Sequence, residues 1–128
     1  MDIGLTYLSQ GKYDDAISYY QRALTIYENA FGVDHIKTAS TIMNIGLTYY
    51  SQGEYDDAIS YYQRSLKIKE NAFGVDHIKT ADTIMNIGST YFSQGKYDDA
   101  IYYQRALTIK ENAFGRMHLE LITSILGT

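Results

Sequence analysis

The stretch Asp34–Phe73, DHIKTASTIMNIGLTYYSQGEYDDAISYYQRSLKIKENAF, contains two apolar stripes on either side of a glycine. In the first half the apolar positions recur every three or four residues, and they are Ala39, Ile42, Ile45 and Tyr49. The second half repeats this spacing with Tyr55, Ala58, Ile59, Tyr62, Leu66 and Phe73. This periodicity indicates amphipathic helices. The stretch therefore predicts two antiparallel helices, one over 36–51 and one that follows Glu54, joined by a tight turn.

Capping residues mark the ends of both helices. The carboxylate of Asp34 is suited to accept hydrogen bonds from the free N–H groups of the first turn. Gly53 stands where a left-handed C-terminal cap is needed, and Gly74 ends the second helix. Asp56 and Asp57 belong to the first turn of the second helix, where negative charge complements the helix dipole.

The same helix pair recurs along the chain with a period of 42 residues. Asp2–Met43 aligns without gaps to Asn44–Met85, and 35 of the 42 positions are identical. A third copy begins at Asn86 and loses the pattern after Gly115. A fixed period of this size is typical of solenoids, in which each unit packs only on its neighbours. The chain is therefore predicted to be an all-α, right-handed solenoid of antiparallel helix pairs.

We expect a single domain over 1–128 made of about three repeats and a C-terminal capping helix. The predicted boundaries place repeat 1 at about 1–33, repeat 2 at 34–75, repeat 3 at 76–115 and the capping helix at 116–126. The first helix of repeat 1 is expected to be short, because Met1 aligns with a mid-helix position of the next copy.

One residue is missing from the second helix of the third copy. Ser18 and Ser60 follow Ile in the earlier copies, whereas Ile101 is followed directly by Tyr102. A deletion inside a helix rotates the residues beyond it by about 100°. A gap placed in the loop instead would bring Asp99 to a buried alanine position, which is costly. A local distortion or re-phased packing near Tyr102 is therefore expected.

Composition excludes several classes of function. The 128 residues carry a net charge of -4 with no basic cluster, so nucleic-acid binding is not expected. The chain has no Cys, which excludes disulfides and thiolate zinc sites. No apolar run approaches the roughly 18 residues of a membrane span. We expect a cytoplasmic protein without membrane partners.

Two recurring features resemble catalytic or metal sites but favour a structural interpretation. His35, His77 and His118 occupy one linker position in each copy, and copies of one position lie too far apart to share a metal ion. The acidic pairs at 14–15, 56–57 and 98–99 recur at helix starts. Three-fold recurrence argues against an active site, so we predict no enzyme activity, no metal and no cofactor.

The residue pattern resembles a tetratricopeptide repeat, a family whose motif combines Leu-Gly, Tyr, Ala, an aromatic and a small residue at set offsets. In the middle copy these positions hold Ile42, Ile45, Gly46, Tyr49, Ala58, Tyr62 and Ser65, and in the first copy Gly4, Tyr7, Ala16, Tyr20 and Ala23. The period of 42 and the longer second helix are similar to the kinesin light chain type of repeat.

The resemblance implies that the first helix of each pair lines a concave groove that binds peptides. The residues on the non-core side of these helices are Leu5, Leu8, Ser9, Ser40, Met43, Asn44, Leu47, Tyr50, Ser51, Asp82, Met85, Asn86, Ser89, Phe92 and Ser93. Asn44 and Asn86 are the best candidates, since an amide both donates to and accepts from a peptide backbone. A solvated residue or an inter-repeat hydrogen bond is the structural alternative. No position of the set is Lys or Arg, which argues against a carboxylate clamp.

Three hypotheses about function remain at the level of the sequence. The leading one is a non-catalytic scaffold that binds a protein or peptide segment in the groove. The first alternative is a structural module whose chains stack head to tail through their ends into homo-oligomers, since near-identical repeats make the ends complementary. The second is a regulatory repeat segment of a larger multidomain protein.

Overall fold

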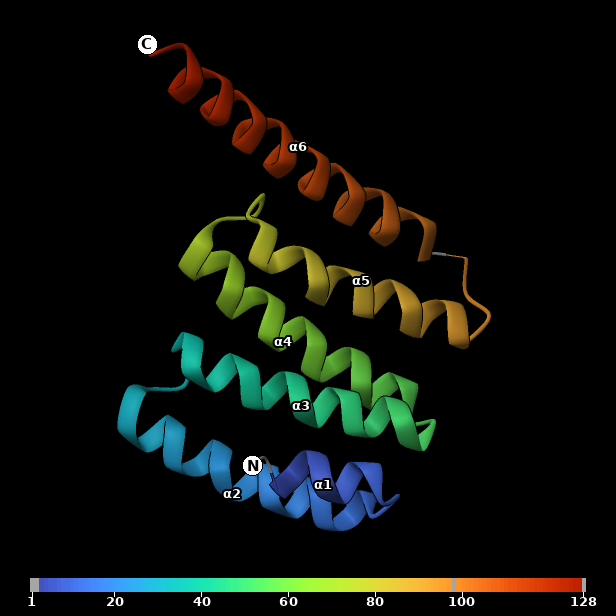
Figure 1. Ribbon diagram of the computed structural model, residues 1–128. Helices are drawn as coiled ribbons and strands as arrows, with labels where there is room; N and C mark the ends of the chain where they lie inside the picture. The colour runs from blue at the N-terminus through green and yellow to red at the C-terminus, as the bar shows by residue number, and fades with distance from the viewer. Residues whose placement is uncertain (1–2, 98, 128) are drawn as a thin grey trace.

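Six helices stack in sequence order in the computed structural model, which describes residues 3–97 and 99–127. The helices are α1 (Ile3–Ser9), α2 (Tyr13–Phe31), α3 (Ile36–Gln52), α4 (Tyr55–Phe73), α5 (Ile78–Ser93) and α6 (Asp99–Leu126). Each helix packs on the next one in the chain (Figure 1). The described part of the chain contains no strand, and the all-α solenoid predicted from the repeat is confirmed.

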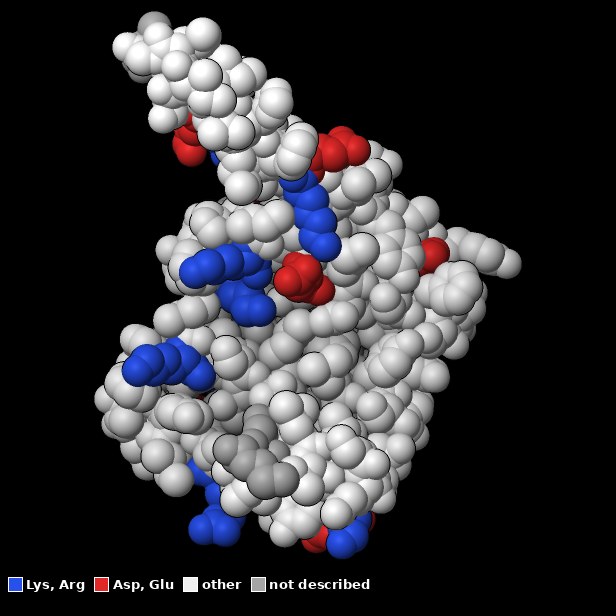
Figure 2. Space-filling view, in the orientation of Figure 1, with Lys and Arg blue, Asp and Glu red and all other residues white. Residues whose placement is uncertain are grey.

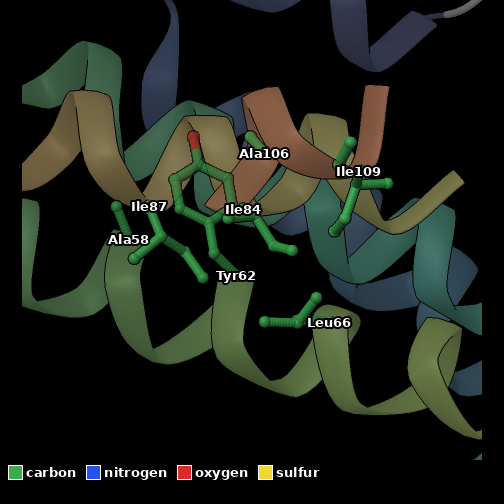
Figure 3. Close-up of a cluster of buried hydrophobic side chains, with 8 residues drawn as sticks. Ala58, Tyr62, Leu66, Ile84, Ile87, Ala106 and Ile109 are labelled. Carbon is green, nitrogen blue, oxygen red and sulfur yellow. The ribbon is translucent and has the colours of Figure 1, made fainter. Parts of the chain in front are cut away.

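The two predicted stripes form the core of the middle unit. Ala39, Ile42 and Ile45 of α3 are fully buried, as is Ala58 of α4. Tyr62 is 1% exposed, and it lies in one cluster with Ile84 and Ile87 of α5 and with Ala106 and Ile109 of α6 (Figure 3). A second cluster joins α2, α3 and α4. Each cluster draws residues from two successive units, so the apolar core is continuous along the stack.

Histidine, not aspartate, caps the first helix of a unit. His35 is the N-cap of α3, and its Nδ1 accepts a hydrogen bond of 3.0 Å from the backbone N–H of Lys37. His77 does the same for α5 with Lys79. The predicted cap at Asp34 is therefore wrong by one residue, because the imidazole reaches the first free N–H groups from the following position. This capping role accounts for the histidines at 35 and 77, whereas His118 lies inside α6.

The other predicted helix ends are confirmed. Gly53 adopts the left-handed conformation, with φ 83° and ψ 9°, and closes α3. Asp56 and Asp57 lie in the first turn of α4, and Asp99 lies in that of α6. Its sequence neighbour Asp98 falls outside the described residues.

Gly46 lets α3 and α4 approach closely. A Cβ atom at this position would lie 2.8 Å from the Tyr62 ring and 3.3 Å from the backbone oxygen of Ala58. Gly4 stands against the Tyr20 ring in the same way. These contacts provide the packing reason for a glycine inside the helix.

Gly46→Ala is expected to destabilise the chain by up to about 2 kcal/mol. Overpacking costs about 1–3 kcal/mol, and the better helix propensity of alanine offsets about 1 kcal/mol of that cost. Gly115→Ala is the matched control, because a Cβ atom there meets nothing within 4 Å and the residue lies inside α6. We expect this control to be stabilising by about 1 kcal/mol. Urea unfolding followed by circular dichroism measures both, and equal signs for the two variants would contradict the close approach.

The third unit absorbs the missing residue at the start of its second helix. The backbone oxygen of Asp99 lies 3.4 Å from a Cβ atom built on Gly88, which matches the place of Ala58 opposite Gly46. Ala100 and Ile101 are consequently turned outward, and Ile101 is 71% exposed although its counterpart Ile59 is buried. The helix begins at Asp99, two residues later along the repeat than α4, and Tyr97 is 93% exposed.

Beyond the deletion the normal packing is retained. Ala106 and Ile109 are buried like their counterparts Ser65 and Ile68. The pair Tyr91–Tyr102, with ring centroids 5.4 Å apart, reproduces Tyr49–Tyr61 at 5.5 Å. The distortion expected near Tyr102 is therefore found at the N-terminus of the helix instead, because shifting three or four residues there disturbs less packing than rotating the whole remainder of α6.

The predicted separate capping helix at 116–126 is wrong. A single helix, α6, runs without a break through Gly115 to Leu126, and its last part extends away from the stack (Figure 1). Gly115 is not among the glycines with positive φ, whereas Gly32 and Gly74, its counterparts, have φ values of 99° and 95° and end their helices. Residues 116–126 cover none of the third unit and are all exposed.

Candidate functional site

The predicted groove residues all lie on one side of the first helices of the units, α1, α3 and α5. We call this side the A-helix face. None of these residues is buried: Met43, Asn44, Leu47, Tyr50, Asn86, Ser89 and Leu8 are half-buried, and Leu5, Ser9, Ser40, Ser51, Asp82, Met85, Phe92 and Ser93 are exposed. They surround the core without belonging to it, as the helical spacing predicts.

A pocket between α3 and α5 brings four of these residues together. Leu47 and Tyr50 of α3 face Asn86 and Ser89 of α5, and Tyr62 of α4 completes the lining. The pocket has a volume of about 160 Å³. Its apolar wall comes from Leu47 and the aromatic rings, and its polar groups come from α5. Sequence spacing alone does not predict that Tyr62, a core residue, contributes to this wall.

The side-chain amides of Asn44 and Asn86 are not used in packing. Within residues 3–97 and 99–127 neither amide forms a hydrogen bond to another protein group, although the backbone oxygens of both residues accept bonds from Thr48 and Thr90. The structural alternative of an inter-repeat hydrogen bond therefore does not apply to them. Both residues are half-buried on the A-helix face, and their amide donors and acceptors are not satisfied by other described residues.

Several other residues of the A-helix face contact neighbouring helices. The hydroxyl of Tyr50 lies 2.9 Å from Oγ of Ser93. Tyr103 of α6 donates to Oγ of Ser89 over 3.0 Å. Met43 packs against the core cluster of Figure 3 and is half-buried there. These contacts join α3 to α5 and α5 to α6 beside the A-helix face.

A second pocket, of about 220 Å³, lies between α2 and α3 where the seven residues of α1 leave α2 uncovered. Ser40 and Asn44 line it together with Lys37 and with Tyr19 and Tyr27. The predicted set omits Lys37 because its part in α3 begins at Ser40, although Lys37 lies three residues before Ser40 and so on the same side of α3. The side chain of this lysine lies over the Phe31 ring, 4.6 Å from its centroid, and so reaches the edge of the groove.

Lysines of the second helices also reach the A-helix face. Lys110 of α6 lies 3.4 Å from the carboxylate of Asp82 and 3.5 Å from the sulfur of Met85. Lys69 of α4 donates to Thr83 over 2.9 Å. Burial lowers the pKa of Lys69, and the nearby Asp82 partly offsets this. Figure 2 shows charged side chains on the upper and left parts of the face it draws and few on its lower right. Lys110 of α6 thus adds a positive charge to the A-helix face, whose predicted residues include no Lys or Arg.

Two tyrosines near the A-helix face, Tyr49 and Tyr62, have raised pKa values. Burial raises the pKa of Tyr62 well above its usual range, with a smaller contribution from Tyr50. Burial also raises the pKa of Tyr49, helped by Tyr61 and nearby carboxylates. Both hydroxyls are therefore neutral near pH 7. The described part of the chain holds no group of three His, Asp or Glu side chains arranged for a metal ion.

Comparison with known families decides the assignment of the fold. The model of the tetratricopeptide repeat family matches residues 1–71 and 38–112. The chain belongs to the tetratricopeptide repeat family. The two matches overlap, and together they cover every residue of the A-helix face. No curated protein matches the chain.

Solved structures place this tetratricopeptide chain near the kinesin light chain type. The crystal structure of BtubC (BKLC) from P. vanneervenii superposes with a TM-score of 0.80 at 27% identity, over 88% of this chain and 46% of the other. A putative kinesin light chain from Podosopora anserina with nearly identical TPR-like repeats gives a TM-score of 0.75 at 12% identity, over 87% and 53%. The second likeness shows the fold alone. The chain spans about half the length of both structures.

Among the described residues no helix of this tetratricopeptide chain combines the length and the apolar character needed to cross a bilayer.

Proposed function

We propose that the chain is a non-catalytic protein-interaction module that holds an extended peptide segment on its A-helix face between α3 and α5. The observation that carries the proposal is the pocket formed by Leu47, Tyr50, Asn86 and Ser89. The side-chain amide of Asn86 beside it forms no hydrogen bond to any other described residue. Tetratricopeptide repeats are in general protein-interaction scaffolds, which supports the coarser part of the proposal.

The pocket favours a peptide over a small metabolite. Its volume of about 160 Å³ suits one apolar side chain, and small-molecule sites are usually larger, at about 300–1,000 Å³. The free amide of Asn86 is suited to bind the N–H and C=O groups of a backbone that passes the pocket. Lys37, beside the second pocket, favours a ligand with an acidic or carbonyl group at that end. A carboxylate clamp of several basic groups is not part of this proposal.

A peptide-display selection followed by fluorescence anisotropy tests the proposal. The selected peptide should bind Asn86→Ala about tenfold more weakly, because one hydrogen bond contributes about 0.5–1.5 kcal/mol. Leu47→Asp should abolish binding, since it places a charge in the apolar wall of the pocket. Asn71→Ala is the matched control, because Asn71 is an exposed asparagine of α4 away from both pockets.

Unchanged affinity for both Asn86→Ala and Leu47→Asp would contradict the site. Circular dichroism of each variant shows that any loss reflects the groove and not the fold. Failure to select any peptide, together with a mass that rises steadily with concentration, would instead favour end-to-end stacking of the chains.

A further inference from the structure

Residues 117–126 have the sequence of the first helix of a further unit. They align with 76–85, so that Leu121, Ile122, Ser124 and Ile125 take the places of Thr80, Ala81, Thr83 and Ile84. All four counterparts in α5 are fully buried. In α6 the three apolar residues are 59%, 40% and 73% exposed. The segment thus carries the pattern of a buried helix at a place where no other described element covers it.

The surface that such a helix covers is also exposed on α6. Leu107 is the counterpart of Leu24 and Leu66, which are 4% and 7% exposed because the first helix of the next unit packs on them. Leu107 itself is 51% exposed. Phe114, about two helical turns further along, is 69% exposed. The molecule therefore exposes both partners of an interface between units, residues 117–126 and the side of α6 that carries Leu107. Both partners lie on one straight helix, so they cannot pack against each other within one chain (Figure 1).

We propose that two copies of the chain pair through α6, each copy laying its residues 117–126 on the Leu107 face of the other. The two helices run antiparallel, as α4 and α5 do within the chain. The interface is then the existing interface between units, formed twice around a two-fold axis. This is the geometry of an exchanged element, a low-cost route to a dimer because the contacts are those the sequence already encodes.

Contacts within the chain fix the register of this pair. Lys69 donates to Thr83 across the α4–α5 interface over 2.9 Å, and the counterparts of these residues are Lys110 and Ser124. In the dimer Lys110 of one copy therefore lies beside Ser124 of the other. This register places the two-fold axis near Met117. Figure 2 shows the outer part of α6 as mostly white, with few charged side chains in the view it draws.

Multi-angle light scattering over a hundredfold range of concentration is the first test. The proposal predicts a species of twice 14.6 kDa that does not grow further, because the two-fold interface closes on itself. Ile125→Asp and Leu107→Asp should each raise the dimer dissociation constant by more than about a hundredfold, since each buries two uncompensated charges per dimer. Both residues are exposed in the single chain, so the fold of each unit is not expected to suffer.

Thr123→Asp is the matched control. Position 123 is the counterpart of Asp82, which is exposed on α5, so a carboxylate there stays at the edge of the interface. This variant should dimerise like the parent chain. Equal loss of dimer in Thr123→Asp and Ile125→Asp would overturn the proposal, as would a monomer at every concentration.

A spin-label distance separates this pairing from head-to-tail stacking. The chain has no Cys, so Thr123→Cys carries a single label. Six residues on either side of the two-fold axis at a rise of 1.5 Å, with helix axes 8–10 Å apart, place the two labels roughly 20 Å from each other. A dimer without a distance in this range would overturn the antiparallel arrangement. The outcome is independent of peptide binding on the A-helix face.

Discussion

Tyr62→Ala is expected to destabilise the chain by about 3–5 kcal/mol, the usual cost of removing a large buried ring. The ring is 1% exposed and belongs to the cluster that joins α4 to Ile84 and Ile87 of α5 and to Ala106 of α6 (Figure 3). Its loss leaves a cavity inside unit two and also weakens the contact with unit three. Because a solenoid has only neighbour contacts, cooperative unfolding should be lost together with stability.

Chemical denaturation followed by both circular dichroism and tyrosine fluorescence measures this effect. Tyr97→Ala is the matched control, since Tyr97 is 93% exposed, and we expect a change within about 0.5 kcal/mol. The parent chain should give coincident transitions with the two probes, and Tyr62→Ala should give separate ones. A cost below that of the control would contradict the place of this ring in the shared core.

Inserting a serine between Ile101 and Tyr102 is expected to stabilise the chain by about 2 kcal/mol. The insertion restores the spacing of the other copies, so Ile101 should turn inward to the place that buried Ile59 has in α4. Burying an isoleucine side chain contributes about 1.5–3 kcal/mol. Asp99 would leave the position opposite Gly88, and the helix would begin earlier in the repeat.

A double-mutant cycle tests the insertion. Ile101→Ala should be nearly neutral in the parent chain, where this side chain is 71% exposed. In the chain with the inserted serine the same substitution should cost about 2–4 kcal/mol, as for a buried isoleucine. Equal effects in the two backgrounds would mean that Ile101 does not change its environment, and that the re-phased start of α6 is not caused by the missing residue.

The sequence predicts the fold well because the apolar spacing of one helix pair recurs in nearly three copies. Apolar spacing gives the helices, and Gly53 and its counterparts give the turns. The capping residue was misassigned because Asp is a common N-cap, whereas the imidazole of His35 competes for the same N–H groups from the next position. Residue preferences at helix ends do not decide between Asp34 and His35, because both side chains can accept a hydrogen bond from a backbone N–H.

Two features of α6 could not be predicted from local pattern. The missing residue can be absorbed by rotating all of α6 after Ile101 or by shifting only the residues at its start. The choice depends on how many packing contacts each arrangement disturbs, which local sequence does not show. Gly115 has the sequence context of Gly74, yet the helix continues through it. The linker that follows Gly74 is Val-Asp-His, whereas Arg116-Met117-His118 follows Gly115 and lacks the turn-favouring Asp.

The candidate site was predictable as a face but not as a pocket. Helical spacing places Asn44 and Asn86 on the outer side of their helices. That their amides remain without a partner among the described residues depends on the distance between neighbouring units. Tyr62 and Lys110 come from the second helices, and a rule based on one face of the first helices does not include them. Lys37 lies on that face at the start of α3, and the predicted set, which in α3 begins at Ser40, leaves it out.

The most direct test of the account is a map of amide chemical-shift changes in the chain when a selected peptide binds. We predict that the largest changes fall on α3 and α5 around Leu47, Asn86 and Ser89, with small changes on the outer sides of α2 and α4. Changes concentrated on α6 beyond Gly115, or on the second helices, would contradict the proposal that the A-helix face binds the ligand.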